Sequence, residues 1–367
     1  MSVSTRRIGP VDLAAQHRAL AGEIEAAVLR VLRSGRYVLG EEVAAFEAEL
    51  ARWFGARHVV TCASGSDALT LALLALGIRP GDEVIVPAFT IAIDAEVVAL
   101  LGGVPVFVDV DAATGAIDPS RVAAAITPRT RAVIAVHLYG VPTDVAAIRA
   151  ACGAIPVIED AAQALGSRLG ERACGTLGDF GCFSFFPTKN LGAAGDGGAL
   201  VVGDDARAKQ LRALRNHGCT ARYVHDAVGL NSRLDELQAA ILRVKLRHVA
   251  GAQARRAELA ARYDAALAPL GLAAPAVPGG RTTNFHQYTI RHPRRDALRD
   301  HLARVGIDAA VHYPHAVFQH APYRGSHADE DFPVAVRLAA EVLSLPLHAE
   351  LADEDVERVV AAVRAFE

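Results

Sequence analysis

The sequence predicts an α/β protein built on a largely parallel β-sheet with helices on both faces. Three observations lead to this expectation. Short apolar runs typical of buried strands recur through the first half of the chain, and helical patterns separate most of them. The chain has 367 residues, which is long enough to bury a core on each face of such a sheet. The last third mixes a strand-like run with helices and indicates a smaller α+β domain.

Seven strand-like runs make up the expected sheet. Each is short, rich in Val, Ile, Phe or Ala, and bounded by small or charged residues. They occupy residues 58–62, 83–86, 104–108, 132–137, 156–158, 180–186 and 198–202.

Helical spacing of apolar residues is clear at both ends of this region. It covers residues 12–33 and 41–54, and the segment SGRYVLG separates the two helices. A longer pattern, SRLDELQAAILRVKLRHV, begins at Ser232, which has the spacing of a capping box with Asp235. We expect this helix to lead into a second domain.

The second domain is expected to be small. FHQYTIR, residues 285–291, alternates like a strand, and residues 294–305 have the pattern of a helix. We therefore divide the chain into a large domain, residues 1–245, and a small domain, residues 246–367.

Composition argues against several classes of protein. The net charge of −3 gives no reason to expect nucleic acid or membrane as a partner. The N-terminus lacks the apolar run of a signal peptide, and the longest uncharged apolar stretch, residues 68–78, is too short to span a bilayer. The five cysteines have no C-x-x-C spacing, and the histidines have no metal-ligand spacing. We expect a soluble cytoplasmic protein without a metal site.

Lys189 is the candidate reactive group. Lysine occurs at only three positions, 189, 209 and 245, and every other basic side chain apart from histidine is arginine. Arginine stays protonated in proteins, whereas a desolvated lysine becomes a neutral amine that can attack a carbonyl and form a Schiff base. Lys189 follows the aromatic run FSFFPT, and no charged residue separates it from Asp179. Lys209 and Lys245 lie in arginine-rich helical segments and fit the ordinary alternative, a solvated surface lysine.

Pyridoxal phosphate is the common protein-held carbonyl partner of such a lysine, and it requires a phosphate site and an acid for its ring nitrogen. The segment Ala63 to Asp67 follows a strand and opens a helix, which is the geometry that directs backbone N–H groups at an anion. Ser64 and Ser66 add hydroxyl donors, although both are also ordinary capping residues.

Asp160 is the candidate acid. It follows the strand-like run 156–158, and ligands of parallel sheets bind at the carboxyl ends of strands. Gln163 lies three residues further on and could reach the ring hydroxyl. The alternative is that Asp160 only caps a helix that starts at Ala161.

The glycine run GAAGDGG after Lys189 does not fit a dinucleotide-binding loop. That fingerprint precedes a helix, whereas this run leads into the strand 198–202. A tight turn between two strands explains these glycines better.

Taken in order, these segments resemble the DegT/StrS-type nucleotide-sugar aminotransferases, pyridoxal phosphate enzymes with the aspartate-aminotransferase fold (fold type I). The likeness runs almost end to end, through SGRYVLG, GDEVIVPAFT, VIEDAAQALGS, FSFFPTKNLGAAGDGG, GLNSRLDELQAAILRVKL and GIDAAVHYP. The ordered set of motifs is specific to that family.

The resemblance implies roles for individual residues. Lys189 would form the internal aldimine, Asp160 would pair with the pyridine nitrogen, and Gln163 would lie by the ring hydroxyl. The phosphate positions would be Gly65, Ser66 and Ser184, with Asn231 reaching the phosphate of the neighbouring subunit of a homodimer. Residues expected near the ring or the substrate are Ile91, His286, Tyr313 and Phe318.

The implied reaction moves an amino group from glutamate to a keto-deoxysugar nucleotide in amino-sugar biosynthesis. Lysine at position 189 favours amino transfer over the dehydration performed by relatives with histidine there. The combination NSRLDELQAAILRVKL with VHYP is most similar to enzymes that act on TDP-3-keto-6-deoxyhexoses. The alternatives are a 4-keto sugar nucleotide, a keto-cyclitol, or a pyridoxal phosphate-binding regulatory protein without turnover.

Two departures from the family pattern concern the substrate site. Ile91 stands where the family usually has an aromatic residue stacked on the pyridine ring. Ala316 and Phe318 stand where proline and histidine are common. An unusual amino acceptor would be consistent with these changes.

Overall fold

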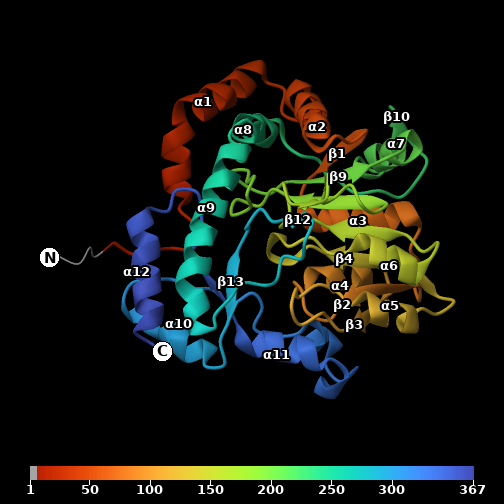
Figure 1. Cartoon of the computed structure of the whole chain (residues 1–367). Helices are drawn as coiled ribbons and strands as arrows, with labels where there is room; N and C mark the ends of the chain where they lie inside the picture. Colours follow the sequence, from red (N-terminus) through yellow and green to blue (C-terminus); the bar gives the residue numbers. More distant parts are fainter. Residues whose placement is uncertain (1–5) are drawn as a thin grey trace.

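The structure is a computed structural model, and it describes residues 6–367. Its centre is a seven-stranded sheet in the order β1-β9-β8-β5-β4-β2-β3, which confirms the predicted fold class (Figure 1). All strands are parallel except β9, which pairs antiparallel with β1 and β8. The strands are β1 (His58–Cys62), β2 (Glu83–Pro87), β3 (Val104–Val108), β4 (Thr130–Val136), β5 (Val157–Asp160), β8 (Phe180–Ser184) and β9 (Gly198–Val202).

Helices cover both faces of the sheet because successive strand residues point to opposite sides. On β1, for example, Val60 belongs to the core of one face and Val59 to that of the other. The first face carries α3 (Gly65–Leu76), α4 (Ile93–Leu100), α7 (Asp205–Leu214) and α11 (Pro333–Glu341). The second carries α2 (Glu41–Phe54), α5 (Pro119–Ala125), α6 (Val145–Cys152) and α8 (Glu236–Leu246).

A third apolar core lies away from the sheet, at the left of Figure 1. It is formed by α9 (Val249–Leu267), α10 (Arg295–Arg304), α12 (Asp353–Arg364) and the antiparallel pair β13 (Tyr288–Arg291) and β14 (Val342–Leu345). Ile8 from the N-terminal segment also joins it, while α11 packs on the sheet. A residue of the predicted large domain therefore packs in the third core, and a helix of the predicted small domain packs on the sheet. The boundary at residue 245 stays a prediction.

Smaller elements complete the chain. Helix α1 (Leu13–Ser34) packs along α8 at the top of Figure 1. The short strands are β6 (Arg168–Leu169), β7 (Arg172–Ala173) and β12 (Arg281–Thr282) in one sheet, and β10 (Cys219–Ala221) with β11 (Val224–His225) in a hairpin. Within residues 6–367 no helix combines the length and apolar character that crossing a membrane requires.

The predicted helix from Ser232 is wrong at its start and at its end. Helix α8 begins at Glu236, and a break after Leu246 separates it from α9. Ser232 does not cap the helix, because its hydroxyl accepts from Ala63 N–H (3.1 Å) and donates to Asp67 Oδ2 (2.6 Å). The serine thus ties the chain before α8 to the start of α3.

The predicted tight turn between β8 and β9 is also wrong. A loop of residues 185–197 joins these strands and carries Lys189. Glycines in the loop and at its end permit close backbone approach: a Cβ on Gly192 would lie 2.3 Å from Pro187 O, and one on Gly198, the first residue of β9, would lie 2.2 Å from Ser64 O. The loop is therefore folded tightly over the edge of the sheet.

Candidate active site

A cavity of about 420 Å³ opens where the carboxyl ends of the parallel strands meet. It gathers residues from β5, β8, the start of α3, the loop after β2 and the segments around 286 and 313. Most of the predicted site residues line it: Gly65, Ser66, Ile91, Asp160, Gln163, Ser184, Lys189, His286 and Tyr313.

Two predicted site residues, Phe318 and Asn231, do not line this cavity. Phe318 is 2% exposed, and its ring packs against Phe332 with 4.9 Å between centroids. Ala316 is fully buried in the same core, so this turn uses its apolar side chains for packing. Asn231 lies exposed on the surface, where its backbone pairs with Asn216.

Lys189 lies in the loop after β8, and its backbone N–H donates to Phe186 O (2.8 Å). The side chain is only partly exposed and opens into the cavity. Burial lowers the pKa of Lys189 below its ordinary value, although the negative charges of Asp160 and Asp94 act in the opposite direction. The lysine is therefore not a solvated surface residue.

Lys245 does not fit the expectation of a solvated lysine either. It is half-buried, and its Nζ donates to Gly192 O (2.7 Å) and to Gln16 Oε1 (2.8 Å). Burial lowers the pKa of this amine too. Lys245 holds the loop that carries Lys189, whereas Lys209 is exposed as expected.

Asp160 ends β5 and is 6% exposed. Its Oδ1 accepts a hydrogen bond from Ala162 N–H (2.9 Å). The residues that follow Asp160 form turns, whereas the alternative interpretation of the sequence expected a helix from Ala161. Asp160 therefore does not cap a helix. The carboxylate lines the cavity from the carboxyl end of this central strand.

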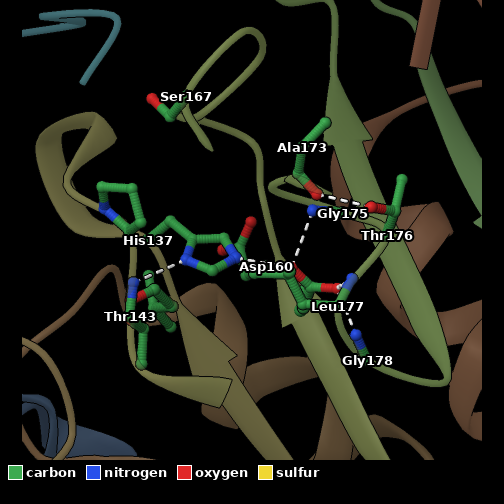
Figure 2. Close-up of polar contacts among 12 residues, drawn as sticks. His137, Thr143, Asp160, Ser167, Ala173, Gly175, Thr176, Leu177 and Gly178 are labelled. Atoms are coloured by element: carbon green, nitrogen blue, oxygen red, sulfur yellow. Dashed lines mark hydrogen bonds and ion pairs between the residues drawn. The ribbon is translucent and has the colours of Figure 1, made fainter. Parts of the chain in front are cut away.

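The preceding residue, Glu159, anchors this end of β5 from the other side. Its fully buried carboxylate accepts hydrogen bonds from His137 Nε2 (2.8 Å), Gly175 N–H (2.7 Å) and Leu177 N–H (2.6 Å). Thr143 N–H donates to His137 Nδ1 (2.9 Å), so the proton that points at Glu159 is on Nε2 (Figure 2). This network connects the ends of β4 and β5 and fixes the direction of Asp160.

The start of α3 has the geometry that an anion site requires. Ser64 caps the helix, because its Oγ accepts from Asp67 N–H (3.0 Å). Helix geometry provides no intrahelical partner for the N–H groups of Gly65 and Ser66, and both residues line the cavity. A Cβ on Gly65 would lie 2.7 Å from the Ser184 Cβ, so glycine is needed for β8 to approach this helix end. Capping and anion binding are therefore compatible here.

Gln163 links the opposite wall of the cavity. Its Oε1 accepts from Tyr139 N–H (2.6 Å), and its Nε2 donates to Tyr313 Oη (3.1 Å). Burial raises the pKa of Tyr313, so the phenol keeps its proton. Burial also lowers the pKa of His286 and lowers that of His312 to about 4, and both imidazoles are neutral at pH 7.

Other lining residues were not predicted from the sequence. They include Thr90, Phe186, Asp196, Gln287 and His312. Asp196 lies in the glycine run and His312 in the VHYP motif, so their position in these motifs was the available signal.

Comparison with known proteins identifies the family. Residues 18–364 match the DegT/DnrJ/EryC1/StrS aminotransferase family. The chain belongs to this family. The aminotransferase is 46% identical to UDP-N-acetyl-3-dehydro-α-D-glucosamine 3-aminotransferase from Acidithiobacillus ferrooxidans, over 96% of each chain. It is 45% identical to dTDP-3-amino-3,4,6-trideoxy-α-D-glucose transaminase from Streptomyces venezuelae, over 99% of this chain and 97% of that one.

Solved structures agree with this assignment. DesV from S. venezuelae in complex with a ketimine intermediate has a TM-score of 0.96 and 45% identity, and the match covers 98% of each chain. NtdA from Bacillus subtilis with bound cofactor PMP has a TM-score of 0.90 and 29% identity, covering 100% of this chain and 86% of that one. The predictions of family and enzyme class are confirmed.

Proposed function

We propose that this aminotransferase uses pyridoxal phosphate to move an amino group from glutamate to a nucleotide-linked keto sugar. The observation that carries the proposal is the convergence, in one cavity, of a desolvated lysine, a buried carboxylate and a helix N-terminus. These are the three groups that pyridoxal phosphate requires.

The residues present fit this cofactor. The N–H groups of Gly65 and Ser66 and the hydroxyl of Ser184 would hold the phosphate, and Asp160 would face the ring nitrogen. Ile91 would cover the ring with an aliphatic side chain. When bound, the cofactor supplies an electron sink that stabilises negative charge at the carbon next to the amine.

The protein's own groups perform the proton transfer and the positioning. Because its pKa is lowered, Lys189 can be the neutral amine that first links the cofactor and then moves a proton at the reacting carbon. Gln163 and Tyr313 form a neutral hydrogen-bonded wall that orients a ring hydroxyl. The neutral imidazole of His286, held by Asn190 (3.0 Å), lines the same cavity and is proposed to contact substrate.

The proposed amino acceptor is a TDP-linked 3-keto-6-deoxyhexose. The names of both relatives place the amino group at position 3 of the sugar, which supports this choice of position. UDP-linked 3-keto sugars, 4-keto sugars and keto-cyclitols are the alternatives that a substrate panel would reveal. We further propose a homodimer in which Asn231 completes the partner's site, and a cytoplasmic location.

Absorbance spectroscopy of the purified protein with pyridoxal phosphate tests the proposal. Glutamate should abolish the absorbance of the lysine-linked cofactor, and the correct keto sugar should restore it. We expect Lys189→Ala to reduce turnover by about 10²–10⁴-fold or more, since that is the contribution of a positioned acid–base group. A fully active Lys189→Ala protein, or cofactor binding without turnover on any keto sugar, would contradict the proposal, and the latter result would favour a regulatory protein.

A further inference from the structure

A second buried carboxyl, that of Asp94, lies beside Asp160. Asp94 is in the first turn of α4, directly after the cavity-lining residue Ile93, and it is fully buried. Its carboxyl is within hydrogen-bonding reach of the Asp160 carboxyl. Sequence patterns did not single out this residue.

The hydrogen bonds of Asp94 are incomplete if it is ionised. Its Oδ2 accepts from Thr90 Oγ1 (2.7 Å). Its Oδ1 is buried and has no partner among the residues that the structure describes. A buried carboxylate oxygen without a donor is costly, and the cost rises when a second carboxylate lies next to it.

A proton on Asp94 resolves this conflict. A protonated carboxyl has one O–H donor, and the neighbouring carboxylate of Asp160 is an acceptor. Burial, together with the charge of Asp160, raises the pKa of Asp94 well above the ordinary range. Its position in the first helical turn favours a negative charge, but this effect is small for a single terminus and does not offset full burial.

The other titratable groups around the pair do not supply the missing donor. Lys189 lies within electrostatic reach of both carboxyls, but its amine is the group expected to link the cofactor. The charges of Asp94 and Asp160 also act on Cys182 and Tyr313. Burial raises the pKa of both groups, so each keeps its proton and is neutral, and neither can compensate the charge of an ionised Asp94.

We propose that Asp94 is a neutral acid that donates a hydrogen bond to Asp160 and thereby positions the Asp160 carboxylate for the ring nitrogen of the cofactor. The proposal rests on the proposed function only for the identity of that cofactor. A carboxylate that already accepts a hydrogen bond is a weaker base, so the proton between Asp160 and the ring nitrogen stays on the ring. Asp94 is thus a positioning residue that acts through Asp160.

Infrared spectroscopy of the protein without cofactor tests the proton directly. The difference spectrum between wild type and Asp94→Asn at pH 7 should contain the carbonyl stretch of one protonated carboxylic acid. The matched control Asp205→Asn, an exposed aspartate, should leave that band unchanged. Absence of the band from the wild-type protein, or its retention in Asp94→Asn, would overturn the proposal, whatever reaction the enzyme catalyses.

A pH titration of the lysine-linked cofactor's absorbance tests the effect on the ring. Asp94→Asn keeps the shape and a donor, and should leave the midpoint unchanged. Asp94→Leu has a similar branched shape but no donor, so the ring nitrogen should lose its proton more readily and the linked lysine nitrogen should become more basic. We expect the midpoint to rise by about one pH unit. A midpoint that Asp94→Leu leaves unchanged, or that Asp94→Asn shifts equally, would refute the positioning role.

Neither test depends on turnover. If Asp94→Leu fails to fold, by circular dichroism, Asp94→Val is titrated in its place and the same rise is expected, while the infrared band still decides whether Asp94 carries the proton. If glutamate has no effect on the absorbance but the protonated band is present, the proposed function fails and the Asp94–Asp160 pair stands.

Discussion

The chain contains three lysines, and their surroundings give them different chemistry. Lys189 opens into the cavity, Lys245 is tied to two oxygen atoms, and Lys209 is exposed. Arginine could make hydrogen bonds similar to those of Lys245, but it could not provide the neutral amine required at position 189. The surroundings of each lysine therefore determine whether it can react, holds a loop or is solvated.

Reductive alkylation of the protein without cofactor should show this difference. Because burial lowers its pKa, Lys189 loses its proton at a lower pH than an ordinary lysine, whose pKa is 10.5. A small aldehyde with borohydride should therefore modify Lys189 ahead of Lys209 near pH 8, as measured by mass spectrometry of peptides. Lys189→Arg provides the blank, and equal labelling of both lysines at that pH would contradict the shift.

At the scale of elements, the site depends on how strand ends and loops are held. Glu159 binds the end of β5 to His137 and to the loop at 175–178, and Lys245 holds the loop 185–197 from α8. Neither residue lines the cavity. Both are expected to act on the site through the backbone that they fix.

Replacement of Glu159 by glutamine should destabilise the protein strongly. The glutamine amide puts a donor where the carboxylate accepts from backbone N–H groups and from His137. We expect a loss of about 3–5 kcal/mol in the free energy of unfolding, measured by denaturant titration, since one partner of a buried charged network is removed. Glu171→Gln on the surface is the control. A loss below that of ordinary surface substitutions would show that the network is not needed.

Lys245→Met should increase the mobility of the loop 185–197, which carries Lys189. Methionine keeps the apolar stem but cannot donate to Gly192 O or to Gln16. We expect a loss of about 1–3 kcal/mol, the usual cost of an unmade hydrogen bond, and faster amide exchange in residues 185–197. Lys209→Met should change neither quantity. Unaltered exchange in the loop would mean that its glycine-rich packing alone holds it.

At the scale of the whole molecule, the cavity of one chain contains the predicted groups except Asn231 and Phe318. Asn231 is exposed on this chain, as a residue that serves a partner would be. The sharing of active sites across a homodimer stays a prediction, and it can be tested by mixing two inactive variants.

Asn231→Ala and Lys189→Ala subunits should complement one another after exchange. A mixed dimer would hold one site with both residues intact and one with neither. Random association of equal amounts should restore about a quarter of the wild-type activity, because half of the dimers are mixed and each has one complete site. Native mass spectrometry would confirm exchange. Mixed dimers without activity would place Asn231 in its own subunit's site, whereas an Asn231→Ala protein that is fully active by itself would place it outside any site.

The layered α/β fold, its seven strands and the main groups of the cavity could be predicted from the sequence. These depend on local signals: the period of apolar residues, the small-residue start of α3, and a lysine in a chain that otherwise uses arginine. Such signals lie within one element and are readable before the chain folds.

The contacts between residues that are distant in the sequence depend on the tertiary structure. Asp94 of α4 lies next to Asp160 of β5, and Phe318 packs in an apolar core. The hydroxyl of Ser232 donates to Asp67 and does not cap α8. Lys245, which has the sequence context of a surface lysine, holds the loop 185–197 through its hydrogen bond to Gly192 O. The physical reason is that burial and hydrogen-bond pairing arise between elements, so the protonation and role of a buried polar group depend on neighbours that the local sequence does not contain.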